Sequence, residues 1–260
     1  MNLTFQELLA DPPKLHVFKQ GPETPQGIYQ PGELVNRWKL SDEELKFIEA
    51  HVGPNSKTIE TGAGCSTVVF AMKGCQHTCI MPDQSLAERI VAFCKSKNIP
   101  TDRLNFIIGT SETALPNLKE RDFDLALIDG RHGFPQPFLD WYYTAELLKI
   151  GGYVIVDDLH VWVCETLMEF LIAEKRDWKL VHESLGGCVF QKLGNGTQNN
   201  DFGYQPYVHD HSRQFSFVAK LRYLRNLLKR GNYGLFNYTL KLGLKSALMG
   251  KFGERPIGRR

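Results

Sequence analysis

Residues 60–66 read Glu60-Thr61-Gly62-Ala63-Gly64-Cys65-Ser66, and this stretch decides the fold. It overlaps the end of a short run, Lys57–Thr61, that is typical of a strand, and a helical stretch begins near Ser66. Gly62 and Gly64 allow the backbone to turn sharply at the strand end and to approach a ligand closely. We therefore predict a strand, a ligand-binding loop and a helix whose free amides face the ligand.

The residues around this loop argue against two other ligand classes. A dinucleotide site would place a third glycine where Thr67 and Val68 stand, and a phosphate loop would carry a lysine. Glu60 ends the strand beside the loop. Its carboxylate has two possible tasks here, either to receive an ammonium group of the ligand or to fix the loop.

Strand-like and helix-like segments alternate from residue 57 onward, which predicts a doubly wound α/β sheet. Only a Ser-Leu-Gly-Gly turn separates the final two segments, so they should form an antiparallel hairpin at one edge. The expected sheet is seven-stranded and mostly parallel. Its strands are 57–61, 77–81, 104–108, 123–128, 153–156, 179–182 and 188–192, and its helices are 66–73, 84–97, 115–119, 137–149 and 161–175.

The remaining segments suggest how the chain is divided. Residues 1–40 are rich in Pro and Gly and should form an irregular lid or brace. The α/β domain should cover 41–194 and open with a helix capped by the box Ser41-Asp-Glu-Glu44, in which each end residue binds the other's backbone amide. A loop over 195–212 and a basic helical tail over 213–260 should follow.

Carboxylates end two of the apolar predicted strands. Asp129 follows Asp124–Ile128, and Asp157 and Asp158 follow Tyr153–Val156. Three carboxylates that converge on one crevice repel each other unless a cation lies between them, and a hard divalent cation such as Mg²⁺ prefers oxygen ligands. The alternative is structural: Asp129 would cap a loop, and one of the pair would cap a helix that begins near Val161.

Two histidines lie near the same strand ends, and they are candidates for proton transfer. His132 follows Asp129 in Ile-Asp-Gly-Arg-His, and His160 follows Asp158. Imidazole suits proton abstraction from a hydroxyl near neutral pH. The candidate catalytic set is therefore Asp129, His132, Asp158 and His160, although a histidine can equally be structural.

Taken in order, these motifs resemble class I S-adenosylmethionine-dependent methyltransferases over about Lys57–Lys192. The Ile-Asp-Gly-x-His stretch and the Gly-Gly-x-x-x-x-Asp-Asp stretch resemble the metal-assisted branch, which includes catechol and sugar O-methyltransferases. The resemblance implies a methyltransferase fold and an S-adenosylmethionine site. It implies cofactor contacts at Glu60, Gly62, Gly64, Ser66, Ser111 and Asp129, and metal ligands at Asp129, Asp157 and Asp158.

The chain departs from this family at the end of the second predicted strand. The family carries an acid there that holds both ribose hydroxyls, whereas this chain has Met81. Asp83 lies two residues further along and points to the same face if the chain stays extended. We therefore expect Asp83 to hold the ribose.

Charge is unevenly distributed along the chain. The net charge is +2, but residues 213–260 contain 12 Lys and Arg against the single acid Glu254, which gives +11 and leaves −9 elsewhere. The tail places Phe217, Leu221, Leu224 and Leu228 on one helical face and Arg222, Arg225 and Lys229 on another. After a break at Asn232-Tyr-Gly234, a second helix should carry Leu235, Tyr238, Leu242 and Leu248 with Lys241 and Lys245. Such a tail should pack on a second subunit, on the acidic body or on an anionic membrane.

The six cysteines are scattered without metal-finger spacing, and the chain shows neither a secretory signal nor a membrane span, so we expect a cytoplasmic protein with reduced thiols. The favoured function is O-methylation of a small-molecule or sugar hydroxyl with divalent-metal assistance. The acidic body and the lack of an aromatic–basic recognition motif argue against nucleic acid. The alternative is a catalytically inactive scaffold of the same fold that binds a membrane or a partner.

Overall fold

The structure, a computed structural model, describes residues 3–19, 31–36 and 38–248. It divides into two compact units, Met1–Asp201 and Phe202–Arg260, which are described separately. The side chains of 199, 213–217 and 242–248 lie outside the description.

The first unit contains the predicted seven-stranded sheet, with strand order β5-β4-β3-β6-β7-β9-β8. The first five strands in this order run parallel, whereas β9 is antiparallel to both β7 and β8. The expected antiparallel hairpin edge is therefore confirmed. The strands are β3 (Lys57–Thr61), β4 (Gln76–Met81), β5 (Leu104–Ile108), β6 (Phe123–Ile128), β7 (Leu148–Val156), β8 (Trp178–Glu183) and β9 (Cys188–Lys192).

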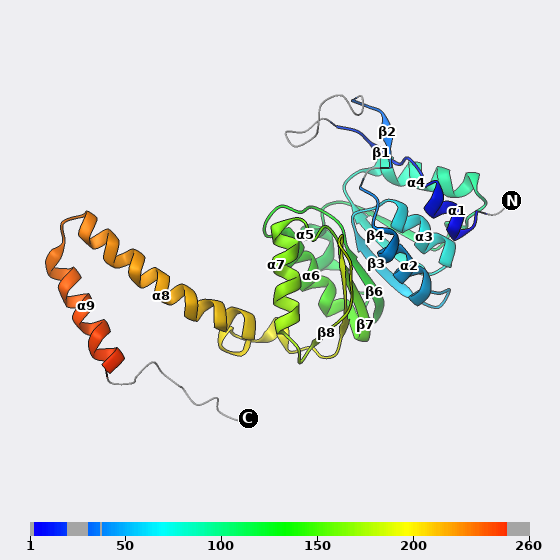
Figure 1. Cartoon of the computed structure of the whole chain (residues 1–260). Coiled ribbons are helices and arrows are strands. Elements are labelled where there is room, and N and C mark those ends of the chain that lie inside the picture. The colour runs from blue at the N-terminus through cyan, green and yellow to red at the C-terminus, as the bar shows by residue number, and fades with distance from the viewer. Residues whose placement is uncertain (1–2, 20–30, 37, 249–260) are drawn as a thin grey trace. The chain divides into compact units, whose positions relative to one another are not determined.

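Helices cover both faces of this sheet, as a doubly wound fold requires (Figure 1). One face carries α2 (Asp42–His51), α3 (Cys65–Lys73) and α4 (Gln84–Ser96), and the other carries α5 (Ser111–Ala114), α6 (Gln136–Leu147) and α7 (Trp162–Ala173). The buried core against α3 and α4 includes Val68, Val69, Phe70 and Ile90, all with no exposed surface. All six cysteines are free and buried.

The strand order reverses between β3 and β6, which are adjacent in the sheet although two strands separate them in the sequence. In open α/β sheets such a reversal forms a crevice outside the carboxyl ends of the two strands, and ligands bind there. Glu60 and Thr61 end β3, and Asp129 directly follows β6. The predicted site residues therefore lie at the edge where this fold binds ligands.

The N-terminal segment is more ordered than its composition predicted. It contains α1 (Phe5–Ala10) and a pair of two-residue antiparallel strands, β1 (His16–Val17) and β2 (Leu34–Val35). Helix α1 begins with a capping box, in which the Thr4 hydroxyl accepts from the Glu7 amide and Glu7 accepts from Thr4. The expectation of wholly irregular structure over 1–40 was wrong for these residues, because the Thr4–Glu7 capping box is a local helix signal that precedes the first proline, Pro12.

The capping box predicted at Ser41 forms only in part. Ser41 caps α2 and accepts from the amides of Glu43 and Glu44. Glu44 does not return to the cap backbone. Its carboxylate is completely buried and accepts hydrogen bonds from the hydroxyls of Ser41 and Ser184, so it ties α2 to the β8–β9 turn.

The second unit is helical, as predicted, but begins earlier. It contains a short 3₁₀ turn (Phe202–Tyr204), α8 (Pro206–Lys229) and α9 (Tyr233–Leu248), so part of the expected 195–212 loop is helix. Among the described side chains of α8, Leu227 is buried, whereas Leu221 and Leu228 of the predicted apolar face are 51% and 41% exposed. Helix α8 contacts α9 and the preceding 3₁₀ turn. Phe217, Leu242, Lys245 and Leu248 have side chains outside the described residues.

Among the described residues, no helix combines the length and the apolar character needed to cross a membrane.

Candidate functional site

The glycine loop is held close to the end of the neighbouring strand. Gly62 adopts φ +94°, and a Cβ at this position would lie 2.0 Å from the carbonyl oxygen of Asp129. The Gly62 amide donates to Ile80, and the Asp129 amide donates to Thr61. Gly62 is thus required by contact with the protein's own backbone, in addition to any ligand.

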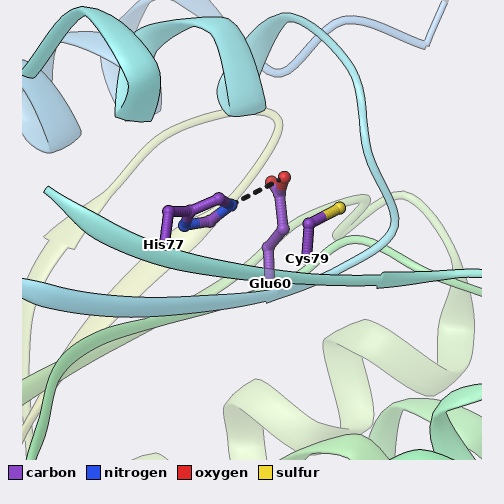
Figure 2. A group of neighbouring side chains, drawn as sticks. All are labelled: Glu60, His77 and Cys79. Carbon is purple, nitrogen blue, oxygen red and sulfur yellow. Dashed lines mark hydrogen bonds and ion pairs between the residues drawn. The ribbon is translucent and has the colours of Figure 1, made fainter. Parts of the chain in front are cut away.

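Glu60 lies beneath this loop, and its carboxylate is only 1% exposed (Figure 2). Ser66 Oγ donates to Oε2 at 2.7 Å, and the Thr67 hydroxyl donates to Oε1. His77 Nε2 lies 3.0 Å from the same Oε1. Both carboxylate oxygens already have protein partners, which favours the loop-fixing task over capture of a ligand's ammonium group.

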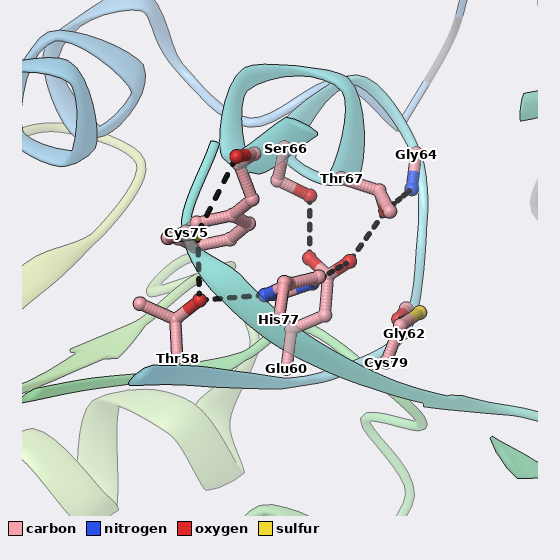
Figure 3. Close-up of polar contacts among 10 residues, drawn as sticks. Thr58, Glu60, Gly62, Gly64, Ser66, Thr67, Cys75, His77 and Cys79 are labelled. Atoms are coloured by element: carbon pink, nitrogen blue, oxygen red, sulfur yellow. Dashed lines mark hydrogen bonds and ion pairs between the residues drawn. The ribbon is translucent and has the colours of Figure 1, made fainter. Parts of the chain in front are cut away.

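The same network reaches the loop backbone at both ends (Figure 3). The Gly64 amide donates to Thr67 Oγ1 at 3.0 Å, and Cys79 Sγ donates to the Gly62 carbonyl at 3.2 Å. Burial, followed by the charge of Glu60, raises the pKa of Cys79 well above its usual value, which keeps it a thiol donor. Ser66 was a predicted cofactor contact, but its hydroxyl donates to Glu60 in this network.

The N-terminal segment lies against the loop, which the sequence did not reveal. A Cβ at Gly64 would lie 3.0 Å from Nε2 of His16. Arg89 of α4 holds this segment, because its Nε donates to the Leu15 carbonyl at 2.6 Å. Burial and then the nearby Arg89 charge lower the pKa of His16, so its neutral form is favoured. The expected lid or brace thus has a defined contact with the loop.

Asp83, the expected ribose ligand, caps α4. It accepts from the Leu86 amide at 3.2 Å and from Ser85 Oγ at 2.6 Å, and its other oxygen lies 3.3 Å from Arg89 Nη2. These hydrogen bonds hold its pKa below the usual value, so it is a carboxylate. The chain turns after Met81, which is 3% exposed, so the extended geometry that we assumed between residues 81 and 83 is absent.

Ser111, the expected adenine contact, begins α5 just beyond β5. Its Oγ accepts from Gln136 Nε2 at 2.8 Å, and the same amide group donates to Asp140 Oδ1 at 2.8 Å. Asp140 is completely buried, and this burial raises its pKa. Gln136 and Asp140 are site-adjacent residues without a sequence motif, and only the packing of α6 against α5 brings them to Ser111.

Two of the three predicted aspartates, Asp129 and Asp158, form a cluster with His132, and Asp157 is not part of that cluster. Ligand atoms of Asp129, His132 and Asp158 all lie within 4.8 Å of one another. His132 Nε2 lies 3.1 Å from Asp158 Oδ2, whereas His160 Nδ1 lies 3.5 Å from Oδ1, and the His160 side chain is 73% exposed. His132 is therefore closer to the carboxylates and better shielded than His160.

Like charge shapes the protonation of this cluster. Burial, and then the charges of Asp157 and Asp158, raise the pKa of Asp129 well above its usual value. Burial and the Asp158 charge raise the pKa of Asp157 to about 7. Asp158 also adopts φ +58°, which is uncommon for a residue with a side chain. Carboxylates this close repel each other when they ionise, and a bound cation would relieve that repulsion.

The structural alternative for the Asp157-Asp158 pair was wrong. Helix α7 has Val161 as its N-cap, without a side-chain cap hydrogen bond. Neither aspartate caps the N-terminus of this helix, so the free amides of its first turn do not compensate the aspartates' charge.

Comparisons with known proteins bear on the fold that holds these residues. Residues 59–159 match the family described as "Methyltransferase domain". Cofactor-bound Rv0187 from MTB is 17% identical, with a TM-score of 0.52 over 61% of this chain and 84% of its own. The O-methyltransferase TomG from Streptomyces achromogenes, solved with SAM, is 16% identical, with a TM-score of 0.51 over 62% and 84%. A methyltransferase from Geobacter sulfurreducens is 15% identical, with a TM-score of 0.50 over 61% and 83%.

No curated protein matches the chain. At these identities the solved structures establish the fold, while the family match identifies the domain that contains the glycine loop and the three aspartates. Residues 59–159 are therefore similar to a methyltransferase domain, and the sheet with its flanking helices shares the fold of these solved structures.

Proposed function

We propose that the protein transfers the methyl group of S-adenosylmethionine to a hydroxyl oxygen of a small molecule or sugar, with a divalent cation at the acceptor side. The observation that carries the proposal is the cluster of Asp129, His132 and Asp158, whose ligand atoms lie within 4.8 Å of one another. It lies beside the glycine loop, because Asp129 directly contacts Gly62.

The residues at this cluster fit a cation. Asp129, Asp158 and the adjoining Asp157 supply oxygen donors, and burial together with the neighbouring negative charges raises the pKa of Asp129 and Asp157, so a nearby cation would favour their ionised forms. His132 adds a nitrogen donor, which widens the choice from Mg²⁺ to metals that accept imidazole, such as Mn²⁺. A bound cation would lower the pKa of an acceptor hydroxyl and so favour the oxyanion.

His132 is the better placed of the two candidate bases. Asp158 lies 3.1 Å from its Nε2 and can orient the ring. If His132 is a metal ligand instead, its substitution should abolish metal binding. If it is the base, its substitution should spare metal binding and lower only the rate.

The experiment begins with titration calorimetry of the full chain with S-adenosylmethionine, with and without Mn²⁺ or Mg²⁺. A screen of glycosides and catechols for methylated products follows, with and without chelator, and with Asp129→Asn as the matched inactive control. Cofactor binding with methyl transfer that chelator abolishes is the expected result. Transfer at full rate in chelator would remove the metal from the mechanism.

A non-catalytic scaffold of this fold is the second candidate, and one observation favours it. Met81 is buried where the family carries its ribose acid, and Asp83 is engaged in capping α4 and pairing with Arg89. A protein that binds neither cofactor nor metal in the titrations above would support this scaffold.

A further inference from the structure

His77 and Cys79 are buried polar residues on β4 that the proposed mechanism does not use. Their side chains point to the α3 side of the sheet, toward Glu60 of the neighbouring strand β3 (Figure 2). His77 has no exposed surface, and its ring stacks on Phe70 of α3 at 4.1 Å between ring centres. Thr58 Oγ1 lies 2.8 Å from Nδ1, so both ring nitrogens have a partner.

We propose that His77 is a positioning residue for the cofactor loop, which it holds through Glu60. The inference rests on the proposed function only in that the loop binds S-adenosylmethionine. The connection runs from His77 to Glu60, from Glu60 to the Thr67 hydroxyl, and from Thr67 to the Gly64 amide (Figure 3).

The physical reason is the cost of a buried carboxylate. Glu60 is 1% exposed, and a buried carboxylate is tolerated only when hydrogen bonds or charges compensate it. Three donors meet it, from Ser66, Thr67 and His77. Without His77, one of these partners is lost and the Glu60 carboxylate must move to find another, which disturbs the Thr67 hydroxyl that holds Gly64.

Cys79 holds the other end of the loop. Its thiol donates to the Gly62 carbonyl, while Thr67 accepts from the Gly64 amide. The backbone on both sides of Ala63 is thus attached to side chains around one buried carboxylate. Preorganised backbone of this kind lowers the entropy that a ligand must remove when it binds.

A metal ion is a competing explanation for Glu60, His77 and Cys79, because their ligand atoms lie within 4.8 Å of one another. Each of these atoms already has a protein partner: Thr67 and His77 for Glu60, Glu60 for His77, and the Gly62 carbonyl for Cys79. The geometry is that of a closed hydrogen-bond network.

The test compares His77→Leu with His77→Gln in the full chain. The glutamine amide can replace Nε2 as the donor to Glu60, whereas leucine cannot donate. Calorimetry with S-adenosylmethionine should show affinity weakened by about tenfold or more for His77→Leu, the scale of one hydrogen bond to a charged group. His77→Gln should stay within about threefold of the wild type.

Two further variants separate positioning from general destabilisation. Leu147→Ala removes a side chain that is 3% exposed at the far end of α6, so it should lower the melting temperature and leave affinity unchanged. Thr67→Val breaks the connection between Glu60 and Gly64. Its effect should not add to that of His77→Leu in the double variant, because both act through one network.

The outcomes are distinct. Equal affinities for wild type and folded His77→Leu overturn the inference, as do equal losses for His77→Leu and His77→Gln. If His77→Leu does not fold, Thr67→Val with unchanged affinity overturns it. Failure of the wild type to bind S-adenosylmethionine refutes the proposed function itself, which is a separate result.

Discussion

Replacing Asp157 with asparagine should stabilise the metal-free protein at pH 8. Asp157 is 8% exposed, and its pKa is raised from 3.8 to about 7 by burial and by the Asp158 charge, with a further contribution from Glu44. Because the folded state keeps this proton at a pH where the unfolded state has lost it, stability falls as pH rises from about 4 to about 7. Asparagine keeps the shape and removes the titration.

The magnitude follows from the two pKa values. At about 1.4 kcal/mol for each pH unit between 3.8 and about 7, ionised Asp157 costs the folded protein about 4 kcal/mol at pH 8. This free energy is an upper value. Asp129 interacts with Asp157, so the two carboxyl groups titrate together and part of the cost belongs to Asp129.

The assay is chemical denaturation of the full chain with chelator at pH 5 and pH 8. Wild type should lose stability between these values, and Asp157→Asn should lose less. The difference should be smaller at pH 5, about 1.6 kcal/mol, because only about one pH unit separates pH 5 from the unfolded-state pKa of 3.8. The exposed Asp102→Asn is the matched control and should follow the wild type. Added Mn²⁺ at pH 8 should recover stability in the wild type and less in Asp157→Asn.

An asparagine variant no more stable than wild type at pH 8 would refute the reasoning. So would a wild-type stability that falls no more between pH 5 and pH 8 than the stability of Asp157→Asn. Either result would mean that the carboxylates of Asp129, Asp157 and Asp158 are compensated within the protein, which removes the electrostatic argument for a cation.

Three other changes test neighbouring features. Gly62→Ala should abolish S-adenosylmethionine binding in calorimetry, because its Cβ would lie 2.0 Å from the Asp129 carbonyl oxygen. The control is Gly74→Ala, where φ is +64° and nothing lies within 4 Å of the new Cβ. This control should lower the free energy of unfolding by only about 1–2 kcal/mol and leave binding intact. If Asp83 holds the ribose, Asp83→Ala should weaken cofactor binding by about 1.5–3 kcal/mol. Asp83→Ser keeps an N-cap for α4 and should weaken binding equally. Wild-type affinity in Asp83→Ser would mean that Asp83 only caps the helix. The second unit, Phe202–Arg260, should bind anionic vesicles at low salt. If the full chain does not bind them and is a dimer by sedimentation, while a 1–201 truncation is a monomer, the second unit mediates dimerisation instead.

Local pattern was sufficient for the sheet. Strands 104–108, 123–128 and 188–192 were predicted at their observed bounds, because apolar runs between turn residues leave few other conformations. The position of the crevice followed as well, since parallel strands place their carboxyl ends at one edge. Asp129, Asp157 and Asp158 could therefore be expected together from their places in the sequence.

Other features depended on residues distant in the sequence. His77 and Cys79 join Glu60 because β4 lies beside β3, and His16 reaches Gly64 because Arg89 holds the Leu15 carbonyl. No motif marks such pairs.

The sequence by itself determined the alternation of elements, the glycine loop and the aspartates at strand ends, because each depends on local backbone preference and on the two-residue or 3.6-residue period of side chains. Only the tertiary structure decided which way the polar side chains near the loop face. Glu60 faces the protein interior and Asp83 caps a helix, since a buried or charged group takes the nearest compensating partner, and that partner is chosen by packing.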